Sequence, residues 1–159
     1  MALIQLVYAS LATKPLTEEE LKDLAVVARS NNERHEVTGL LLYKNESFLQ
    51  VIEGEEGKTM RLFEKIRLDS RHEGLVMLRR RQVATRSFPD WAMGFVFVPE
   101  RRCESLVGFL DFLRVRKFTG LVGDTVLTDR IVNGFKGGPW RAAVEAGHIN
   151  RDPSPNPAG

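Results

Sequence analysis

The sequence predicts an α+β fold of the ferredoxin-like βαββαβ type with an added fifth strand. Two observations predict it: five strand-like apolar runs, and two amphipathic helix patterns that fall after the first and third of them. The predicted strands cover residues 3–10, 37–43, 48–54, 74–83 and 94–98. We expect both helices on one face of a mostly antiparallel sheet, and short C-terminal helices on the other face.

The first strand and helix place polar groups beside core residues. In the strand at 3–10, Tyr8 and Ser10 share a face with aliphatic side chains. The capping-box pattern of Thr17 and Glu20 predicts that the helix begins at Thr17. Its apolar stripe, Leu21, Leu24, Ala25 and Ala28, leads at about 100° per residue to the amides Asn31 and Asn32.

The second and third strands form a predicted hairpin around a turn at residues 44–47. The period of two along 48–54 puts Gln50 on the same face as Phe48 and Ile52, and Glu53 on the opposite face. Burying an amide without partners costs roughly 2 kcal/mol or more, so Gln50 is expected to have a polar partner.

The second helix is predicted from about Lys58 to Leu68, with Met60, Phe63 and Ile66 facing inward. The run at 69–72 ends this helix, and the strands at 74–83 and 94–98 follow. Pro89 interrupts the segment between those strands. If the chain is extended from residue 91, alternation places four side chains on one face: Trp91, Met93, Phe95 and Phe97.

Three regions are predicted: a domain at 1–98, a helical extension at 99–147 and a disordered tail at 148–159. The extension offers helix patterns at 104–116 and 124–135, and the tail is polar and rich in proline. The apolar residues of the helical extension form either a surface for a partner or a cover for the sheet. They include Phe109, Phe112, Leu113, Phe135 and Trp140.

Composition excludes several classes of protein. The 159 residues carry a net charge of only +2, too little to indicate nucleic acid or an anionic membrane as the main partner. The single cysteine cannot form an internal disulfide, and no apolar run approaches the ~18 residues of a membrane span. The N-terminus lacks the pattern of a signal peptide, so we expect a cytoplasmic protein. No metal site is predicted.

The polar residues on core-facing positions together describe a slot. Tyr8, Gln50, the two asparagines and the Trp91–Met93 pair each have an ordinary structural interpretation: a core tyrosine, a bonded amide, a helix cap, or packing. In combination they suit a flat heterocycle inserted between the two helices, because paired amides can meet an edge that both donates and accepts hydrogen bonds.

At these residues the chain resembles the BLUF family of blue-light sensors. The matching motifs span about residues 2–98: LVYAS around Tyr8, SNN at 30–32, VTGLLLY at 37–43, FLQVIEG around Gln50, DSRH at 69–72 and FPDWAM at 88–93. Their joint order and spacing carry the resemblance, which is to a short, stand-alone BLUF photoreceptor.

The resemblance implies FAD as the cofactor, with FMN or riboflavin possible at the same ring site. It implies that Asn32, supported by Asn31, binds the ring near C4=O and N3, and that Arg71 reaches the C2=O side with His72 nearby. Leu24 and Ile66 would sandwich the ring. Lys65 would lie towards the phosphates or be merely solvated.

The resemblance also implies a photocycle without substrate turnover, so no enzyme is expected. Tyr8 would supply an electron, and a proton would follow through Gln50, which lies between Tyr8 and the flavin N5 and O4. Gln50 is left rotated or tautomerised, with Ser10, Trp91 and Met93 tuning its partners. Output is then expected through a homo-oligomer or a downstream signalling protein.

Two other classes share this fold. Arg79, Arg80 and Arg81 lie on a predicted strand, as in RNA-recognition domains, but the stacking aromatics of those domains are missing from the sequence. An acylphosphatase-like hydrolase would need a glycine-rich anion cradle with an arginine and an asparagine in the first loop, which this sequence lacks. Fold alone does not decide among these classes.

Overall fold

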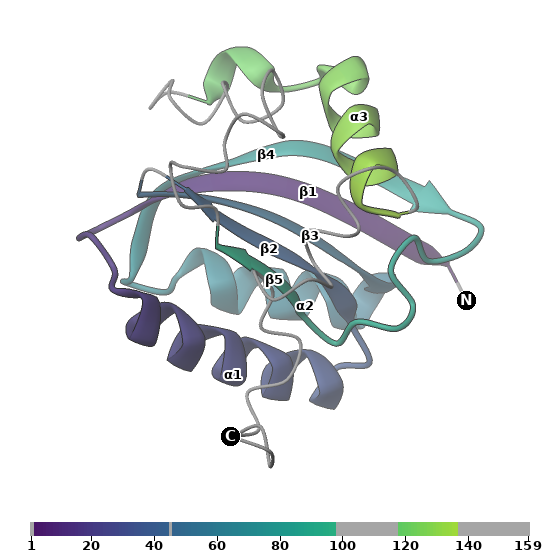
Figure 1. Ribbon diagram of the computed structural model, residues 1–159. Coiled ribbons are helices and arrows are strands. Elements are labelled where there is room, and N and C mark those ends of the chain that lie inside the picture. The colour runs from purple at the N-terminus through teal and green to yellow at the C-terminus, as the bar shows by residue number, and fades with distance from the viewer. Residues whose placement is uncertain (1, 45, 98–117, 137–159) are drawn as a thin grey trace.

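The computed structural model contains one five-stranded sheet with helices on both faces (Figure 1). It describes residues 2–44, 46–97 and 118–136. The strand order is β4-β1-β3-β2-β5. The strands are β1 (Leu3–Ala12), β2 (Thr38–Lys44), β3 (Ser47–Glu55), β4 (His72–Val83) and β5 (Gly94–Phe97).

Neighbouring strands are antiparallel except at one edge, where β5 runs parallel to β2. The helices α1 (Glu18–Arg34) and α2 (Glu56–Arg67) cover one face of the sheet. A 3-10 turn, η3 (Thr119–Leu121), and the helix α3 (Thr125–Lys136) cover the other face. This confirms the predicted ferredoxin-like fold with its added strand.

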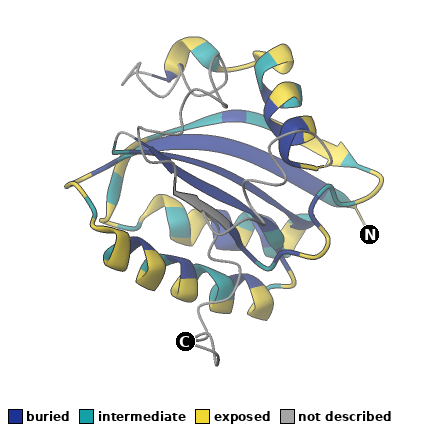
Figure 2. Cartoon of the chain, in the orientation of Figure 1, coloured by how far each residue is buried: buried dark blue, intermediate teal, exposed yellow. Residues whose placement is uncertain are grey.

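The core has two sides because the sheet is buried on both faces (Figure 2). Under α3, Ile131, Val132 and Phe135 pack against the strands in one large apolar cluster. Under α1 and α2, two smaller clusters lie side by side, one around Leu21 and one around Phe63. Phe135 is fully buried, so of the two interpretations of this residue the structure supports the sheet cover.

Local sequence signals explain where the helices begin. Thr17 caps α1, and its side chain and that of Glu20 make the reciprocal bonds of a capping box. The second helix begins two residues earlier than predicted, because the Glu55 side chain accepts a hydrogen bond from the Gly57 N–H and caps the helix directly after β3.

The expectation that Trp91 and Met93 share a face is wrong. Trp91 belongs to the cluster under α3, whereas Met93 belongs to the cluster under α1. The chain bends at residues 92 and 93, so strand alternation does not apply until β5 begins at Gly94. Bonds from Gly39 N–H to Trp91 O (2.9 Å) and from Asn32 Nδ2 to Ala92 O (2.6 Å) hold this bend.

Several sequence predictions fall outside the described residues. The helix expected at 104–116 and the tail at 148–159 both lie there, as does Trp140. The second C-terminal helix, expected at 124–135, is α3. No helix in the described ranges is long and apolar enough to cross a membrane.

Candidate functional site

A cavity of about 200 Å³ lies between α1, α2 and the sheet. Its walls are mostly aliphatic, and its polar atoms come from amides, one hydroxyl, one histidine and a few charged groups at the rim. The lining residues are Ser10, Leu24, Val27, Ala28, Asn31, Asn32, Leu41, Phe48, Gln50, Leu62, Lys65, Ile66, Asp69, Arg71 and His72. The cavity therefore brings together every predicted ring-binding residue except Tyr8, which is the register partner of the lining residue Gln50.

Gln50 lies in the middle of the sheet, on the cavity side. In the strand register it is the direct partner of Tyr8 in β1 and of Leu41 in β2. The residue is 8% exposed, and within the described part of the chain its side chain has no hydrogen-bond partner. The amide lines the cavity, so a ligand bound there can donate to it and accept from it.

Tyr8 carries a second buried polar group without a partner. Its ring packs edge-on against Phe63, with centroids 5.1 Å apart, and the residue is 2% exposed. No described residue hydrogen-bonds to its hydroxyl. Burial raises the pKa of the Tyr8 phenol well above its ordinary value of about 10, so the group stays protonated and is a hydrogen-bond donor.

Opposite partners in an antiparallel sheet have Cβ atoms about 4.5–5.5 Å apart, so Tyr8 and Gln50 are neighbours on one face. A phenol donates and accepts through one oxygen, whereas an amide donates at one end and accepts at the other. Gln50 can therefore accept from Tyr8 while donating into the cavity. The structure places the two side chains next to each other but draws no hydrogen bond between them.

The two asparagines at the end of α1 have different environments. Asn32 is 1% exposed, and it donates to the carbonyl of Ala92 while its amide oxygen is not used in that bond. Asn31 is half-buried, and its side-chain oxygen accepts a hydrogen bond of 2.7 Å from Arg34. Asn32 is thus the asparagine whose orientation the structure fixes, and it joins the cavity wall to the segment before β5.

His72 connects the elements on the side of the cavity away from the asparagines. Its Nε2 lies 2.5 Å from the carbonyl of Ile66, which only accepts, so Nε2 carries a proton. Its Nδ1 lies 2.7 Å from Ser10 Oγ. The ring links β1, the end of α2 and the start of β4. Ser10 and His72 therefore form a rigid corner of the cavity.

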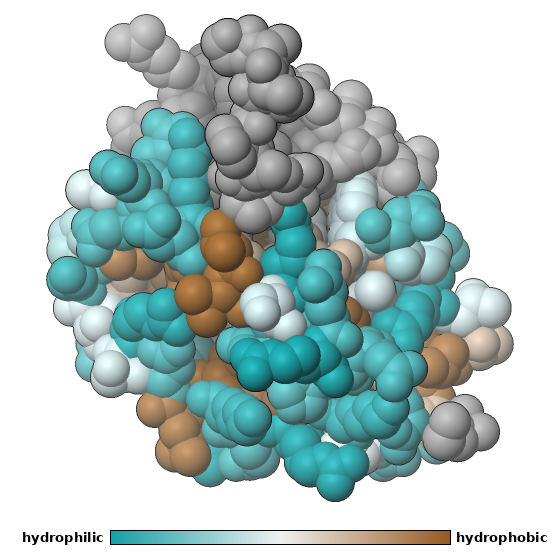
Figure 3. Space-filling view, turned by 90° about the horizontal axis from the view of Figure 1, so that it is seen from below, coloured by the Kyte–Doolittle hydropathy of each residue, from teal (hydrophilic) through white to brown (hydrophobic). Residues whose placement is uncertain are grey.

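Charged residues lie at the rim. Arg71 makes a forked ion pair with Asp69, with Nε 3.0 and 3.1 Å from the two carboxylate oxygens. Hydrogen bonding from Arg71 lowers the pKa of Asp69, and the same contact raises the pKa of Arg71. Lys65 is exposed. Seen from the side of α1 and α2, the coloured surface is mainly hydrophilic, with separate hydrophobic patches (Figure 3).

Trp91 and Met93 do not line the cavity. Met93 is buried in the cluster that contains Leu41 and Phe48, both of which line it, so Met93 borders the cavity from behind. Trp91 is stacked on Phe88 on the far side of the sheet, with ring centroids 5.4 Å apart and planes 7° apart. In this structure Met93, and not Trp91, is on Gln50's side of the sheet.

Sequence reasoning missed five apolar lining residues and one acidic one. These are Val27, Ala28, Leu41, Phe48, Leu62 and Asp69. Each belonged to a predicted helix, strand or motif, but nothing in a period of 3.6 or 2 distinguishes a residue that touches a cavity from one that packs against a neighbour. The DSRH motif itself was the signal that could have pointed to Asp69.

The alternative function based on arginines loses its support. Arg79 is largely buried and bonds to Gln5 and Asp129, Arg80 pairs with Glu56, and Arg81 lies 3.5 Å from Asp129. All three arginines are paired within the molecule, so they do not form a free basic surface for nucleic acid. Among the described residues, no group of three or more His, Cys, Asp or Glu side chains could hold a metal ion.

An aliphatic slot with the Gln50 amide at its base and the fixed Asn32 amide at its edge suits a flat heterocyclic ligand. The chain belongs to the BLUF family, "Sensors of blue-light using FAD", whose pattern matches residues 3–94. BLUF domains bind FAD.

Similar proteins include the alpha subunit of a photoactivated adenylate cyclase from Euglena gracilis, 39% identical over 91 residues, or 56% of this chain and 9% of the relative. The dark-state structure of BlrB, a BLUF protein, has a TM-score of 0.68 at 27% identity and covers 84% of this chain and 97% of that one. The structure of Klebsiella pneumoniae BlrP1 with FMN and cyclic diGMP has a TM-score of 0.60 at 30% identity, and the match covers 87% of this chain and 36% of that one. The chain spans about a tenth of the curated cyclase relatives' length.

Proposed function

We propose that this protein is a blue-light photoreceptor in which Tyr8 and Gln50 form the light-driven relay. One observation carries the proposal: Gln50 lines the cavity, Tyr8 is its partner across β1 and β3, and neither side chain has a hydrogen-bond partner among the described residues. A protein that needed these positions only for stability would gain by filling them with apolar groups.

The residues of the cavity fit a flavin ring. Leu24 from α1 and Ile66 from α2 would contact its two faces, and the free amide oxygen of Asn32 would accept from the ring edge. Arg71 at the rim would reach a carbonyl of the ring, and Lys65 would lie towards the phosphates. FAD is the family's cofactor, and FMN or riboflavin would present the same ring to these residues.

The bound flavin supplies absorption of blue light and acceptance of one electron. With the flavin bound, Tyr8 would give one electron to it and its phenolic proton to the Gln50 oxygen, and Tyr8 would later recover both. The Tyr8 proton is available for this step because burial holds the phenol protonated. Gln50 remains rotated or tautomerised, and its new donor faces the cavity. Ser10 and Met93, on the cavity side of the sheet, would tune which partners Gln50 hydrogen-bonds.

Output would pass to a partner protein or to a second copy of the chain. Gln50 adjoins Leu41 in β2, and Leu41 is paired with residue 95 of β5. A rearrangement at Gln50 therefore reaches the edge strand through one neighbouring strand. No substrate is turned over in this cycle, so we expect no enzymatic activity from the described domain.

The test is the absorption spectrum of the purified, flavin-loaded protein before and after blue light. We expect a yellow protein whose absorption shifts reversibly to longer wavelength. Tyr8→Phe and Gln50→Leu should keep the flavin and lose this shift, whereas Asn133→Ala on the exposed side of α3 should behave as wild type. A colourless protein, or a wild-type shift in either relay variant, would contradict the proposal.

A further inference from the structure

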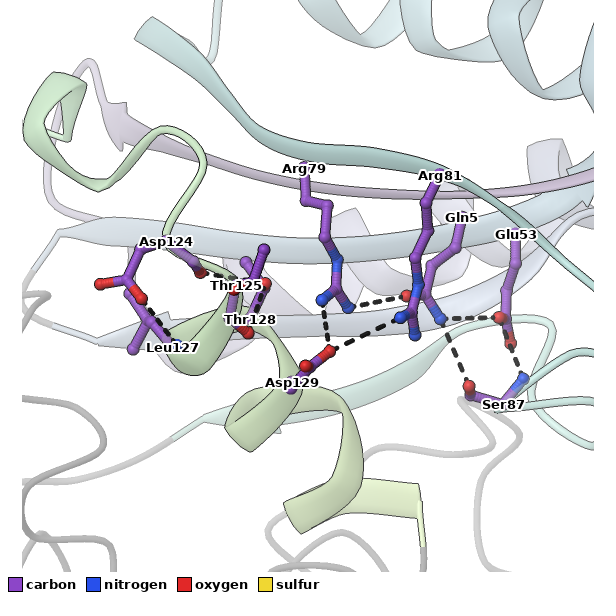
Figure 4. Close-up of polar contacts among 10 residues, drawn as sticks. All are labelled: Gln5, Glu53, Arg79, Arg81, Ser87, Asp124, Thr125, Leu127, Thr128 and Asp129. Atoms are coloured by element: carbon purple, nitrogen blue, oxygen red, sulfur yellow. Dashed lines mark hydrogen bonds and ion pairs between the residues drawn. The ribbon is translucent and has the colours of Figure 1, made fainter.

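A buried carboxylate lies on the sheet face opposite the cavity (Figure 4). Glu53 is three residues after Gln50 on β3 and is 0% exposed. One of its oxygens accepts from Ser87 N–H (3.0 Å) and Gln5 Nε2 (3.1 Å), and the other accepts from Phe88 N–H (2.5 Å). Three donors converge on this one side chain, which is the arrangement expected around an ionised carboxylate.

The charge of Glu53 is balanced through an amide. Gln5 donates to Glu53, and its oxygen accepts from Arg79 at 3.2 Å. The Arg79 side chain is 9% exposed and pairs with Asp129 of α3. This chain of bonds crosses β3, β1 and β4 and ends on α3 (Figure 4). Each member stabilises the next, so the carboxylate is fixed in position.

The segment that Glu53 holds leads directly to Trp91 and Met93. Glu53 binds the backbone at residues 87 and 88, and the Phe88 ring stacks on Trp91. Trp91 in turn lies against Gly94, where an added Cβ would come within 2.8 Å of the ring. Trp91 is thereby held on the α3 face, and the bend that follows puts Met93 beside the cavity.

We propose that Glu53 is a positioning residue of the photoreceptor: its carboxylate anchors Ser87 and Phe88 so that Trp91 packs under α3 and Met93 borders the flavin cavity. Glu53 does not touch the cavity and acts through the segment that it holds. The consequence for the light cycle rests on the proposed function above. The anchoring itself does not rest on it.

Glutamine has nearly the same shape as glutamate but cannot replace it here. A carboxylate accepts at both oxygens, whereas an amide accepts at one oxygen and donates at its nitrogen. In Glu53→Gln the NH₂ group would face at least one of the three N–H donors, so at least one bond to the anchored segment or to Gln5 is lost. The change removes the anchor without creating a cavity.

The experiment uses Trp140→Phe as the parent, so that Trp91 is the sole tryptophan. Acrylamide quenching of its fluorescence and the dark recovery rate after blue light are compared between the parent, Glu53→Gln and the control Glu56→Gln, an exposed glutamate paired with Arg80. We expect Glu53→Gln to raise the quenching constant about twofold and to change the recovery rate about threefold or more, a free-energy effect within the range for a buried bond. The control should change neither.

Unchanged quenching in folded Glu53→Gln, equal changes in the control, or altered quenching with an unaltered recovery rate would each overturn the proposal. If the parent has no photocycle, the proposed function fails, but the quenching comparison still decides whether Glu53 anchors Trp91. If Glu53→Gln does not fold, hydrogen exchange on the parent decides: the Phe88 amide should be strongly protected relative to exposed Asp90, and rapid exchange at Phe88 would refute the anchor.

Discussion

The two faces of the sheet place polar groups in opposite situations. On the face under α1 and α2, the Tyr8 hydroxyl and the Gln50 amide are buried and have no partners among the described residues. On the face under α3, Glu53 and Gln5 are equally buried but fully engaged by neighbours. The same strands, β1 and β3, supply both pairs.

This difference separates stability from function within one sheet. Because side chains alternate along a strand, β3 directs Gln50 to the cavity and Glu53 to the opposite face of the sheet, under α3. The face under α3 is a packed core in which Glu53 and Gln5 are hydrogen-bonded, although the buried Arg79 Nε of the same network has no partner among the described residues. On the face under α1 and α2, the Gln50 amide lines the cavity without a partner among the described residues, so a ligand there can reach it. Substitutions should therefore affect folding on one face and light sensing on the other.

The largest expected effect is on the face under α3. Phe135→Ala removes a fully buried ring that packs α3 on the sheet, and it should destabilise the protein by about 3–5 kcal/mol. Val126→Ala on the same helix, at a side chain that is 77% exposed, should change the free energy of unfolding by less than about 0.5 kcal/mol. Urea unfolding measures both. A small effect of Phe135→Ala would mean that α3 is not part of the core.

On the face under α1 and α2, Asn32→Ala should weaken flavin binding more than it weakens folding. It removes a buried amide that holds Ala92 and lines the cavity, so we expect a loss of about 1–3 kcal/mol, or roughly 5- to 150-fold in affinity. Titration of apoprotein with FAD measures this, with Asn133→Ala as the exposed control. Unchanged affinity would place the ring elsewhere.

The raised pKa of Tyr8 predicts that the free energy of unfolding depends on pH in the alkaline range. Its folded pKa lies above its unfolded value of about 10, so its contribution to stability is fully present below pH 10 and is lost as pH rises through the folded pKa. Between the two pKa values this loss approaches about 1.4 kcal/mol per pH unit. Unfolding in urea between pH 9 and 11 should show that slope in wild type and a smaller slope in Tyr8→Phe. Equal slopes would contradict the burial of an ionisable phenol.

The smallest effect is expected at the rim. Arg71 lowers the pKa of Asp69, so this carboxylate adds stability above its unfolded pKa near 4 and loses it as pH falls through the folded value. The pair is partly exposed, and a surface ion pair contributes about 0.2–1 kcal/mol. Asp69→Asn should therefore destabilise the protein slightly at pH 7, and the difference should vanish near pH 2. A loss of several kcal/mol would show that the pair is structural.

The sequence predicted what depends on local pattern. Thr17 and Glu20 marked the start of α1, and alternation along β3 placed Gln50 and Glu53 on opposite faces. The positions of Trp91 and Met93 were not predictable in this way, because bonds from Gly39 and Asn32, far away in the chain, fix the bend between them. The partners of Glu53 are 48, 34 and 35 residues away, so no local pattern indicates them.

The light-minus-dark infrared difference spectrum of the flavin-loaded protein tests the central claim most directly, because it reports hydrogen bonding at the flavin C4=O. If Gln50 rearranges between Tyr8 and the cavity, blue light should lower the C4=O stretching frequency reversibly in wild type. The same band should stay in place in Gln50→Leu. A wild-type shift in Gln50→Leu would contradict the account, because the moving hydrogen bond would then come from another residue.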